Sequence, residues 1–108
     1  MVNIKEINAL ALKKKLDQNE KIMLIDVRES QEIEICKIKE ALHIPMDEIP
    51  NNIDKIDTKR AIIVMCKSGV RSAQICHYLN EIGYLNVYNL KGGIINWALE
   101  IDTNMDTY

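Results

Sequence analysis

Five consecutive apolar residues, Ala61 to Met65, end directly before a cysteine, and this junction constrains the fold more than any other part of the chain. A short apolar run rich in β-branched residues is typical of a strand that is buried on both faces. Residues 73–82 carry apolar side chains at helical spacing, and Gly83 is a natural helix end. The pattern therefore predicts a strand, a short loop and a helix, with Cys66 where the strand ends.

Apolar runs of the same kind recur along the chain and alternate with segments of helical character. Strands are expected at residues 2–7, 22–25, 41–45, 61–65 and 87–90, and helices after Asn8 and at 30–35, 73–82 and 94–100. Ser30 is the expected cap of the second helix, and 47–56 is expected to form a loop or short helical turns. This alternation predicts an α/β fold with a small central sheet of about five strands, mostly parallel, and helices on both faces. Ligands bind such sheets beyond the carboxyl ends of the strands, where Cys66 is expected to lie.

Length and charge limit the functions open to the chain. Its 108 residues suit one domain, which we expect to span residues 1–101, followed by a polar tail of residues 102–108 that frays. The 14 basic and 16 acidic residues nearly balance, which argues against a nucleic-acid-binding surface. No apolar run approaches the roughly 18 residues of a membrane span, and the first residues lack the apolar core of a signal peptide. These observations predict a cytoplasmic protein with no nucleic-acid or membrane partner.

The three cysteines, Cys36, Cys66 and Cys76, lack the spacing of a disulfide framework or of a CxxC metal pair. The two histidines are isolated and no G-x-G-x-x-G motif is present, so we expect no metal and no cofactor. Cys76 lies on the apolar face of segment 73–82 and is expected in the core. Cys36 lies in a polar stretch, which indicates greater exposure and leaves open a role as a resolving thiol.

The environment expected at Cys66 favours an ionised thiol. A loop that leads into a helix N-terminus presents unpaired backbone N–H groups and the positive end of the helix dipole, and this setting also attracts anions. Gly69 suits the positive φ that such a loop needs to turn its N–H groups inward. A free thiol has a pKa of about 8.5, and we expect the pKa of Cys66 to lie below about 7.

Several segments occur in an order that resembles one known family. They are Leu24 to Glu29 (Leu-Ile-Asp-Val-Arg-Glu), Glu32, Ala41 to Pro45, Cys66 to Ser72, and Leu90 to Ile94 with Trp97. Together they resemble a single-domain rhodanese over most of the chain, residues 7–97. The resemblance implies a rhodanese-like fold and a sulfurtransferase of the thiosulfate sulfurtransferase type. Its catalytic residue would be Cys66, which would take a sulfane sulfur from thiosulfate or another persulfide donor. The acceptor would be a thiol, a carrier protein or cyanide, and the protein would be a monomer or a weak homodimer.

The loop itself supplies the expected substrate-binding residues, which are Lys67, Ser68, Gly69, Val70, Arg71 and Ser72. Lys67 and Arg71 could hold the oxyanion end of thiosulfate, with the alternative that both are solvated surface charges. The hydroxyls of Ser68 and Ser72 could donate hydrogen bonds to the sulfur, and Ser72 is equally a candidate helix cap.

Two departures from related sequences bear on this interpretation. Four residues separate Cys66 from Arg71, whereas relatives of the dual-specificity phosphatase type have one residue more. The shorter loop favours a terminal sulfur over a phosphoryl group. The family's Gly-His-Ile is replaced by Cys36-Lys37-Ile38 and its Pro-Gly-Ala by Lys39-Glu40-Ala41, which is expected to alter a turn rather than the sulfur chemistry.

Asp26 and Arg28 follow the second strand and are expected at the same edge of the sheet as Cys66. We interpret them as part of an ion-pair network that fixes the loop, with Arg28 bound to Glu29 or Glu32, rather than as catalysts. His43 is expected to be a packed or edge residue.

Two other functional hypotheses remain open. A sulfur-carrier or interaction module would form the same persulfide without turnover. A phosphatase or arsenate reductase is disfavoured by the loop length.

Overall fold

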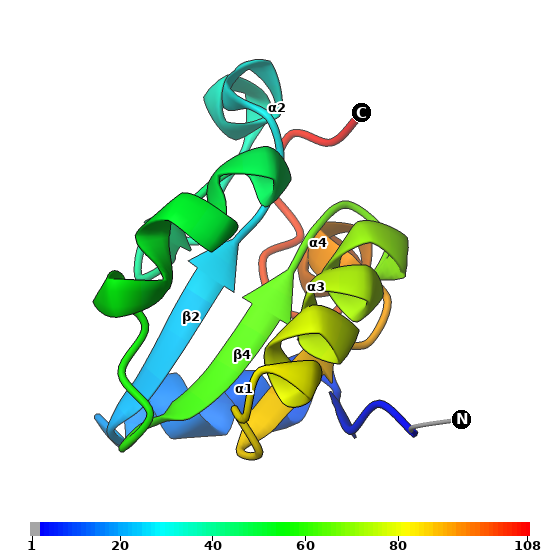
Figure 1. Ribbon diagram of the computed structural model, residues 1–108. Coiled ribbons are helices and arrows are strands. Elements are labelled where there is room, and N and C mark those ends of the chain that lie inside the picture. The colour runs from blue at the N-terminus through cyan, green and yellow to red at the C-terminus, as the bar shows by residue number, and fades with distance from the viewer. Residues whose placement is uncertain (1–2) are drawn as a thin grey trace.

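The computed structural model describes residues 3–108, which form a five-stranded sheet with helices around it (Figure 1). In spatial order the strands are β1 (Glu6–Ile7), β5 (Val87–Leu90), β4 (Ala61–Met65), β2 (Ile22–Asp26) and β3 (Leu42–His43). Every neighbouring pair is parallel, so the strand carboxyl ends share one edge. The predicted α/β fold is confirmed, and within the described residues the sheet is wholly parallel.

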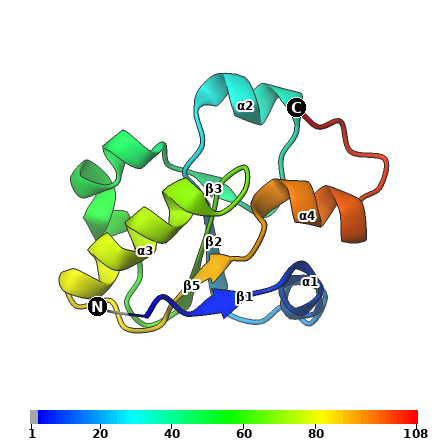
Figure 2. The same cartoon turned by 90° about the vertical axis from the view of Figure 1, so that its right-hand side faces the viewer.

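Helices cover both faces of the sheet (Figure 2). On one face lie α1 (Ala9–Asp17) and α4 (Gly93–Glu100), which also contact each other. On the other lie α3 (Val70–Glu81) and two short 3-10 helices, η1 (Met46–Glu48) and η2 (Pro50–Lys55). The short helix α2 (Ser30–Ile35) lies beyond the carboxyl end of β2 (Figure 1). This arrangement leaves the carboxyl edge of the sheet surrounded by α2, α3 and α4.

Consecutive strand residues belong to opposite halves of the core. Ile25 of β2 is buried in the cluster that contains Leu79 of α3. Its neighbour Leu24 is buried in the cluster that contains Leu12 of α1. Since both faces of the sheet are covered, each strand reads as a continuous apolar run rather than as an alternating one.

Of the two predicted helix caps one is confirmed and one is wrong, and α3 starts earlier than predicted. Asn8 caps α1, where its side-chain oxygen accepts a backbone hydrogen bond at 2.8 Å. The cap position of α2 belongs to Glu29, so the prediction of Ser30 as the cap is wrong and Ser30 is the first helical residue. Helix α3 begins at Val70 rather than at residue 73, because Gly69, with a φ of 106°, turns the chain directly into the helix.

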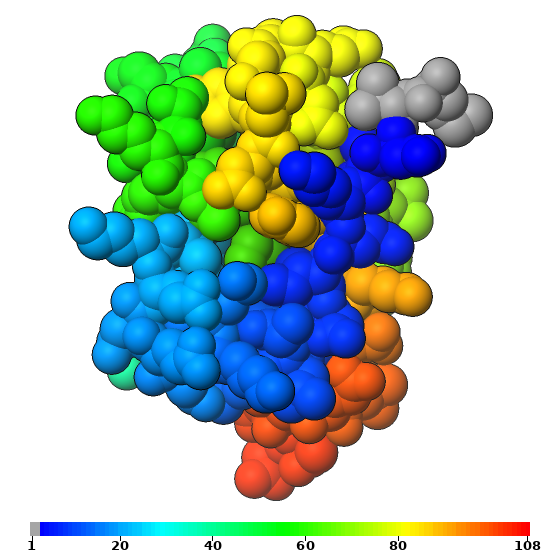
Figure 3. All heavy atoms as spheres, turned by 90° about the horizontal axis from the view of Figure 1, so that it is seen from below, coloured from blue at the N-terminus to red at the C-terminus, as the bar shows by residue number. Residues whose placement is uncertain are grey.

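The face at the amino ends of the strands is remote from Cys66. Figure 3 views this face, which is formed by α1, by the segment that leads into β1 and by the connection from α3 to β5. β1 is shorter than the predicted strand 2–7, and Val2 lies outside the described residues. Among residues 3–108, no helix has the length and apolarity needed to cross a membrane.

Candidate active site

Cys66 directly follows β4 at the carboxyl edge of the sheet, and the residue is only 1% exposed. The start of α4 packs against the backbone at this point. The N–H of Ile94 donates to the carbonyl of Cys66 at 3.0 Å, and the N–H of Ile95 donates to the carbonyl of Lys67 at 3.2 Å. This approach requires Gly93, since a Cβ atom there would lie 2.3 Å from the Lys67 carbonyl oxygen. The turn that leads into α4 therefore supports the loop from behind.

The Cys66 sulfur accepts hydrogen bonds from the loop and from the first turn of α3. The N–H groups of Gly69 and Ser72 lie 3.1 and 3.4 Å from Sγ, and the Ser72 hydroxyl lies 3.3 Å away. Burial raises the pKa of the Cys66 thiol. The opposing hydrogen bonds, from the Ser72 hydroxyl and from the N–H groups of Ser72, Gly69 and Ser68, outweigh burial and leave this pKa below its ordinary value. The direction is the one expected from the sequence, and it favours a thiolate.

Asn89, which the sequence analysis did not single out, holds the same two residues from the neighbouring strand. It is buried near the end of β5, where its Nδ2 donates to the carbonyl of Gly69 at 3.0 Å. Its Oδ1 lies within hydrogen-bond distance of the Ser72 hydroxyl, whose single proton can go either to Oδ1 or to Cys66 Sγ. One feature of the sequence could have indicated Asn89: it is a polar residue inside an otherwise apolar strand, close to the carboxyl edge where ligands bind. Asn89 therefore fixes both the loop glycine and the Ser72 side chain beside the sulfur.

Arg71 is already bound by a carboxylate from another helix. Its Nη1 and Nη2 donate to the two oxygens of Glu32 at 2.7 and 2.9 Å, which joins the start of α3 to α2. The hydroxyl of Tyr108 donates to the same carboxylate. The hydrogen bond from Arg71 lowers the pKa of Glu32 to about 2, against the raising effect of burial. The expectation that Glu32 could pair with Arg28 is therefore wrong, because the ion partner of Glu32 is Arg71.

Tyr108 brings the segment after α4 back to the site, a contact that the polar composition of this tail did not indicate. Figures 1 and 2 both show the last residues beside α2. The Lys67 Nζ lies over the Tyr108 ring, 4.5 Å from its centroid, and the Tyr108 hydroxyl accepts a hydrogen bond from Arg28 at 3.1 Å. Each of the two loop cations thus has a partner, a carboxylate for Arg71 and an aromatic face for Lys67.

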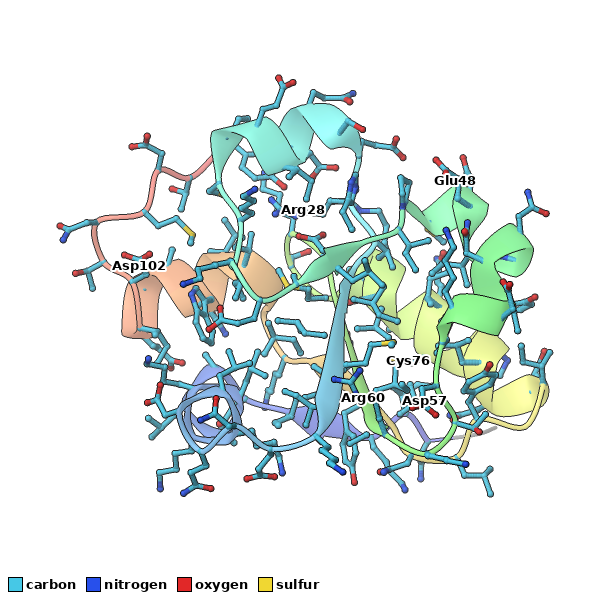
Figure 4. The ribbon with its side chains drawn as sticks, turned by 90° about the vertical axis from the view of Figure 1, so that its left-hand side faces the viewer. Arg28, Glu48, Asp57, Arg60, Cys76 and Asp102 are labelled. Carbon is cyan, nitrogen blue, oxygen red and sulfur yellow. The ribbon has the colours of Figure 1, made fainter. Side chains whose placement is uncertain are left out.

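Arg28 and Asp26 form an ion pair that is almost fully buried, with side chains 0% and 1% exposed. The Nη2 of Arg28 donates to Asp26 at 2.7 Å and also to the carbonyl of Cys36 at 2.8 Å. The Nε2 of His43 lies 2.6 Å from the Arg28 carbonyl oxygen. Figure 4 shows Arg28 inside the molecule beneath α2. These contacts tie together the segments that follow β2 and α2, which supports a structural role, but the partner is Asp26 and not the expected Glu29.

The other two cysteines are buried, and all three are free thiols. Cys36 is 7% exposed and its Sγ accepts a long contact of 3.8 Å from Arg28, so the expectation of an exposed thiol is wrong. Its segment carries charged residues such as Glu34 and Lys37, but residue 36 turns toward the core. Cys76 lies in the core on α3, as predicted, and burial raises its pKa to about 12. Cys66 is therefore the thiol whose surroundings stabilise an anion.

The outer rim of the loop is formed by two exposed residues, Ser68 and Val70, the latter 67% exposed. Ser68 reaches the sulfur through its backbone N–H. Within residues 3–108, no cluster of three or more His, Cys, Asp or Glu side chains is placed to hold a metal ion. The site can stabilise a sulfur anion through directed N–H and O–H donors, with a guanidinium and an ammonium group nearby.

Comparisons with known proteins point to one family. A family model described as a rhodanese-like domain matches residues 8–100. A Bacillus subtilis (strain 168) protein named "Putative sulfurtransferase YtwF" is 41% identical over 99 residues, which cover 92% of this chain and 95% of that protein. A sulfurtransferase of Allochromatium vinosum is 43% identical over 98 residues, 91% of this chain and 90% of that protein. The crystal structure of a rhodanese-like domain protein from Staphylococcus aureus is similar with a TM-score of 0.82 and 31% identity, over 97% of this chain and 99% of that one.

Proposed function

The chain belongs to the family of rhodanese-like domains, and from this premise we propose that it is a sulfurtransferase that carries a sulfane sulfur as a persulfide on Cys66. The observation that carries the proposal is the ring of donors around one sulfur. Gly69 and Ser72 direct their N–H groups at Cys66 Sγ, and the Ser72 hydroxyl lies within hydrogen-bond distance of the same atom. These groups stabilise the thiolate that attacks, and the same donors suit the anionic outer sulfur of a persulfide.

The reaction consists of two displacements at sulfur. In the first, the Cys66 thiolate attacks the sulfane sulfur of the donor, a new S–S bond forms at Sγ, and the S–S bond of the donor breaks. The donor leaves with the electron pair, as sulfite when it is thiosulfate or as a thiolate when it is a persulfide. In the second, an acceptor thiolate or cyanide attacks the outer sulfur and releases the Cys66 thiolate. Neither step requires a paired general acid and base, so the site needs chiefly anion stabilisation.

Intact-mass spectrometry tests the proposal directly. Incubation with thiosulfate or with a small persulfide should add about 32 Da, the mass of one sulfur atom, and dithiothreitol should remove it. Cys66→Ser should take up no sulfur, whereas Cys36→Ser and Cys76→Ser should load like the parent chain. A mass that no donor changes, or a Cys66→Ser variant that still loads, contradicts the proposal.

A second candidate function is a sulfur-carrier module that loads Cys66 but releases the sulfur only to a partner protein. It is favoured by a Bacillus subtilis (strain 168) relative named "Putative sulfur carrier protein YrkF", which is 32% identical over 96 residues, 89% of this chain and 52% of that protein. Release of the sulfur from the loaded chain separates the two candidates, whichever donor loads it: rapid transfer from Cys66 to free cyanide or a small thiol supports the enzyme, and a persulfide that neither removes supports the carrier.

A further inference from the structure

The positive charge of Arg71, which could bind an anionic sulfur donor, is neutralised by a carboxylate in this structure. Arg71 places both terminal nitrogens on the Glu32 carboxylate, at 2.7 and 2.9 Å. The Glu32 side chain is 15% exposed and the Arg71 side chain 34% exposed, so the pair is only partly screened by water. Glu32 is held in place by further hydrogen bonds, from the Tyr108 hydroxyl and from the N–H of Glu29.

The charges around Cys66 leave little attraction for a donor that carries two negative charges. Arg28 is balanced by Asp26, and Arg71 is balanced by Glu32. Among the residues that the structure describes, Lys67 is the loop cation without a carboxylate partner, and its ammonium group lies against the Tyr108 ring. One unbalanced cation beside a thiolate gives a local charge near zero. A dianion such as thiosulfate must therefore approach without a net opposite charge.

We propose that Glu32 is a specificity-determining residue that selects against sulfur donors of high negative charge, so that the chain takes its sulfur from a persulfide on a weakly charged thiol or protein. This inference rests on the proposed function and specifies its donor. The chemical step is unchanged: the Cys66 thiolate forms the new S–S bond, and the donor leaves as its own thiolate. Glu32 changes the rate at which the donor reaches Cys66, because the Coulomb repulsion between the Glu32 carboxylate and the donor grows in proportion to the negative charge of the donor.

Glu32→Gln isolates this charge. The amide oxygen of Gln can still accept from Arg71 Nη1 and from the N–H of Glu29, the two donors to Oε1. One negative charge is lost together with the two hydrogen bonds to Oε2. Glu34→Gln is the matched control, because Glu34 is exposed on the same helix and makes no side-chain hydrogen bond or ion pair in the described residues. Thermal unfolding of both variants verifies that they are folded.

The experiment measures the second-order rate constant for sulfur loading, by intact mass, with three donors of graded charge. They are thiosulfate, a dianion; benzenethiosulfonate, a monoanion; and aminoethyl persulfide, whose ammonium group cancels the persulfide charge. For Glu32→Gln we expect a rise of about fivefold with thiosulfate and about twofold with benzenethiosulfonate. No change is expected with aminoethyl persulfide, and Glu34→Gln should match the parent chain with all three. Added salt should shrink the thiosulfate effect.

Two outcomes overturn the role of Glu32. One is a Glu32→Gln variant that loads from every donor at the parental rate. The other is a change of the same size for all three donors, since a purely structural effect does not depend on donor charge. Loading by aminoethyl persulfide in either case leaves the proposed function intact. Failure of all three donors to load the parent chain ends both proposals.

Discussion

The side chain of Asn89 connects β5 to the loop around Cys66, since its Nδ2 donates to the carbonyl of Gly69 at 3.0 Å and its Oδ1 accepts from the hydroxyl of Ser72. This side chain thus links a strand to a loop residue, Gly69, that lies twenty positions earlier in the chain. It holds two of the residues whose N–H groups reach the sulfur, Gly69 and Ser72, so the donor ring depends on a strand that contributes no atom to it.

Replacement of Asn89 by Leu should destabilise the protein, because it removes both hydrogen bonds and leaves the buried Ser72 hydroxyl without its acceptor. We expect the free energy of unfolding to fall by about 1–3 kcal/mol, measured by urea titration. Asn86→Leu is the control, because Asn86 is exposed just before the same strand and should change stability little. Equal stability of the two variants would show that the Asn89 contacts contribute nothing.

Replacement of Ser72 by Ala should raise the pKa of Cys66, because the thiolate then loses a hydroxyl whose proton can turn from Asn89 Oδ1 to Sγ, the group that lowers this pKa most. Less thiolate is then present at any given pH near neutrality. The measurement is the rate of alkylation by iodoacetamide as a function of pH. Cys76 stays silent in this assay, because its pKa is about 12 and it is fully buried.

Ser68→Ala serves as the control for the alkylation profile. The Ser68 hydroxyl is exposed and the residue acts on the sulfur through its backbone N–H, so the midpoint should not move. A Ser72→Ala profile that coincides with the parental one would exclude the hydroxyl from thiolate stabilisation.

Replacement of Gly93 by Ala should disturb the loop, because the added Cβ would lie 2.3 Å from the Lys67 carbonyl oxygen. Sulfur loading is expected to slow by about tenfold to a hundredfold, since small displacements of a reacting group reduce rates strongly. Gly83→Ala is the matched control, because Gly83 also has a positive φ, 106°. A Cβ atom at Gly83 would meet nothing within 4 Å, so this variant tests the backbone conformation without the steric clash. The control should lose stability and keep its loading rate; equal loading rates in the two variants would count against support of the loop by α4.

Replacement of Arg28 by Met should strongly destabilise the fold, because it leaves the Asp26 carboxylate buried without its cation. The expected loss is about 3–5 kcal/mol in the free energy of unfolding, and the double variant Asp26→Leu with Arg28→Met should recover part of it. Lys13→Met, which breaks an exposed pair with Asp17, should cost less than about 1 kcal/mol. A double variant as unstable as the single one would argue against a buried charge as the cause.

Stability at acid pH should depend on Glu32. Its folded-state pKa of about 2 lies below the ordinary value of about 4.3, so the carboxylate contributes stability above about pH 4.3. That contribution is lost as the pH falls from about 4.3 toward 2 and amounts to at most about 3 kcal/mol. Urea unfolding at a series of pH values should show a shallower acid loss for Glu32→Gln than for Glu34→Gln. Parallel curves would contradict the depressed pKa.

Local patterns in the sequence were sufficient to predict the sheet, its helices and the thiol at the strand end. The apolar run from Ala61 to Met65 has the length and composition of a doubly covered strand, and strands that alternate with helices favour a parallel sheet. Gly69 could be predicted for a similar reason, since a short turn from strand to helix needs positive φ. These features depend on neighbours in the chain, and their physical causes are therefore visible in the sequence.

The partners of the site residues were decided by the tertiary structure alone. Glu32 meets Arg71 across 39 positions, and Tyr108 reaches Glu32 across 76. No local periodicity encodes such pairings, because they arise only when the parallel strands bring their carboxyl ends, and the segments that follow them, to one edge. The same reason explains why the exposure predicted for Cys36 was wrong. The charged residues of its segment are visible in the sequence, whereas the apolar cluster and the Arg28 side chain around it are brought together only by the fold.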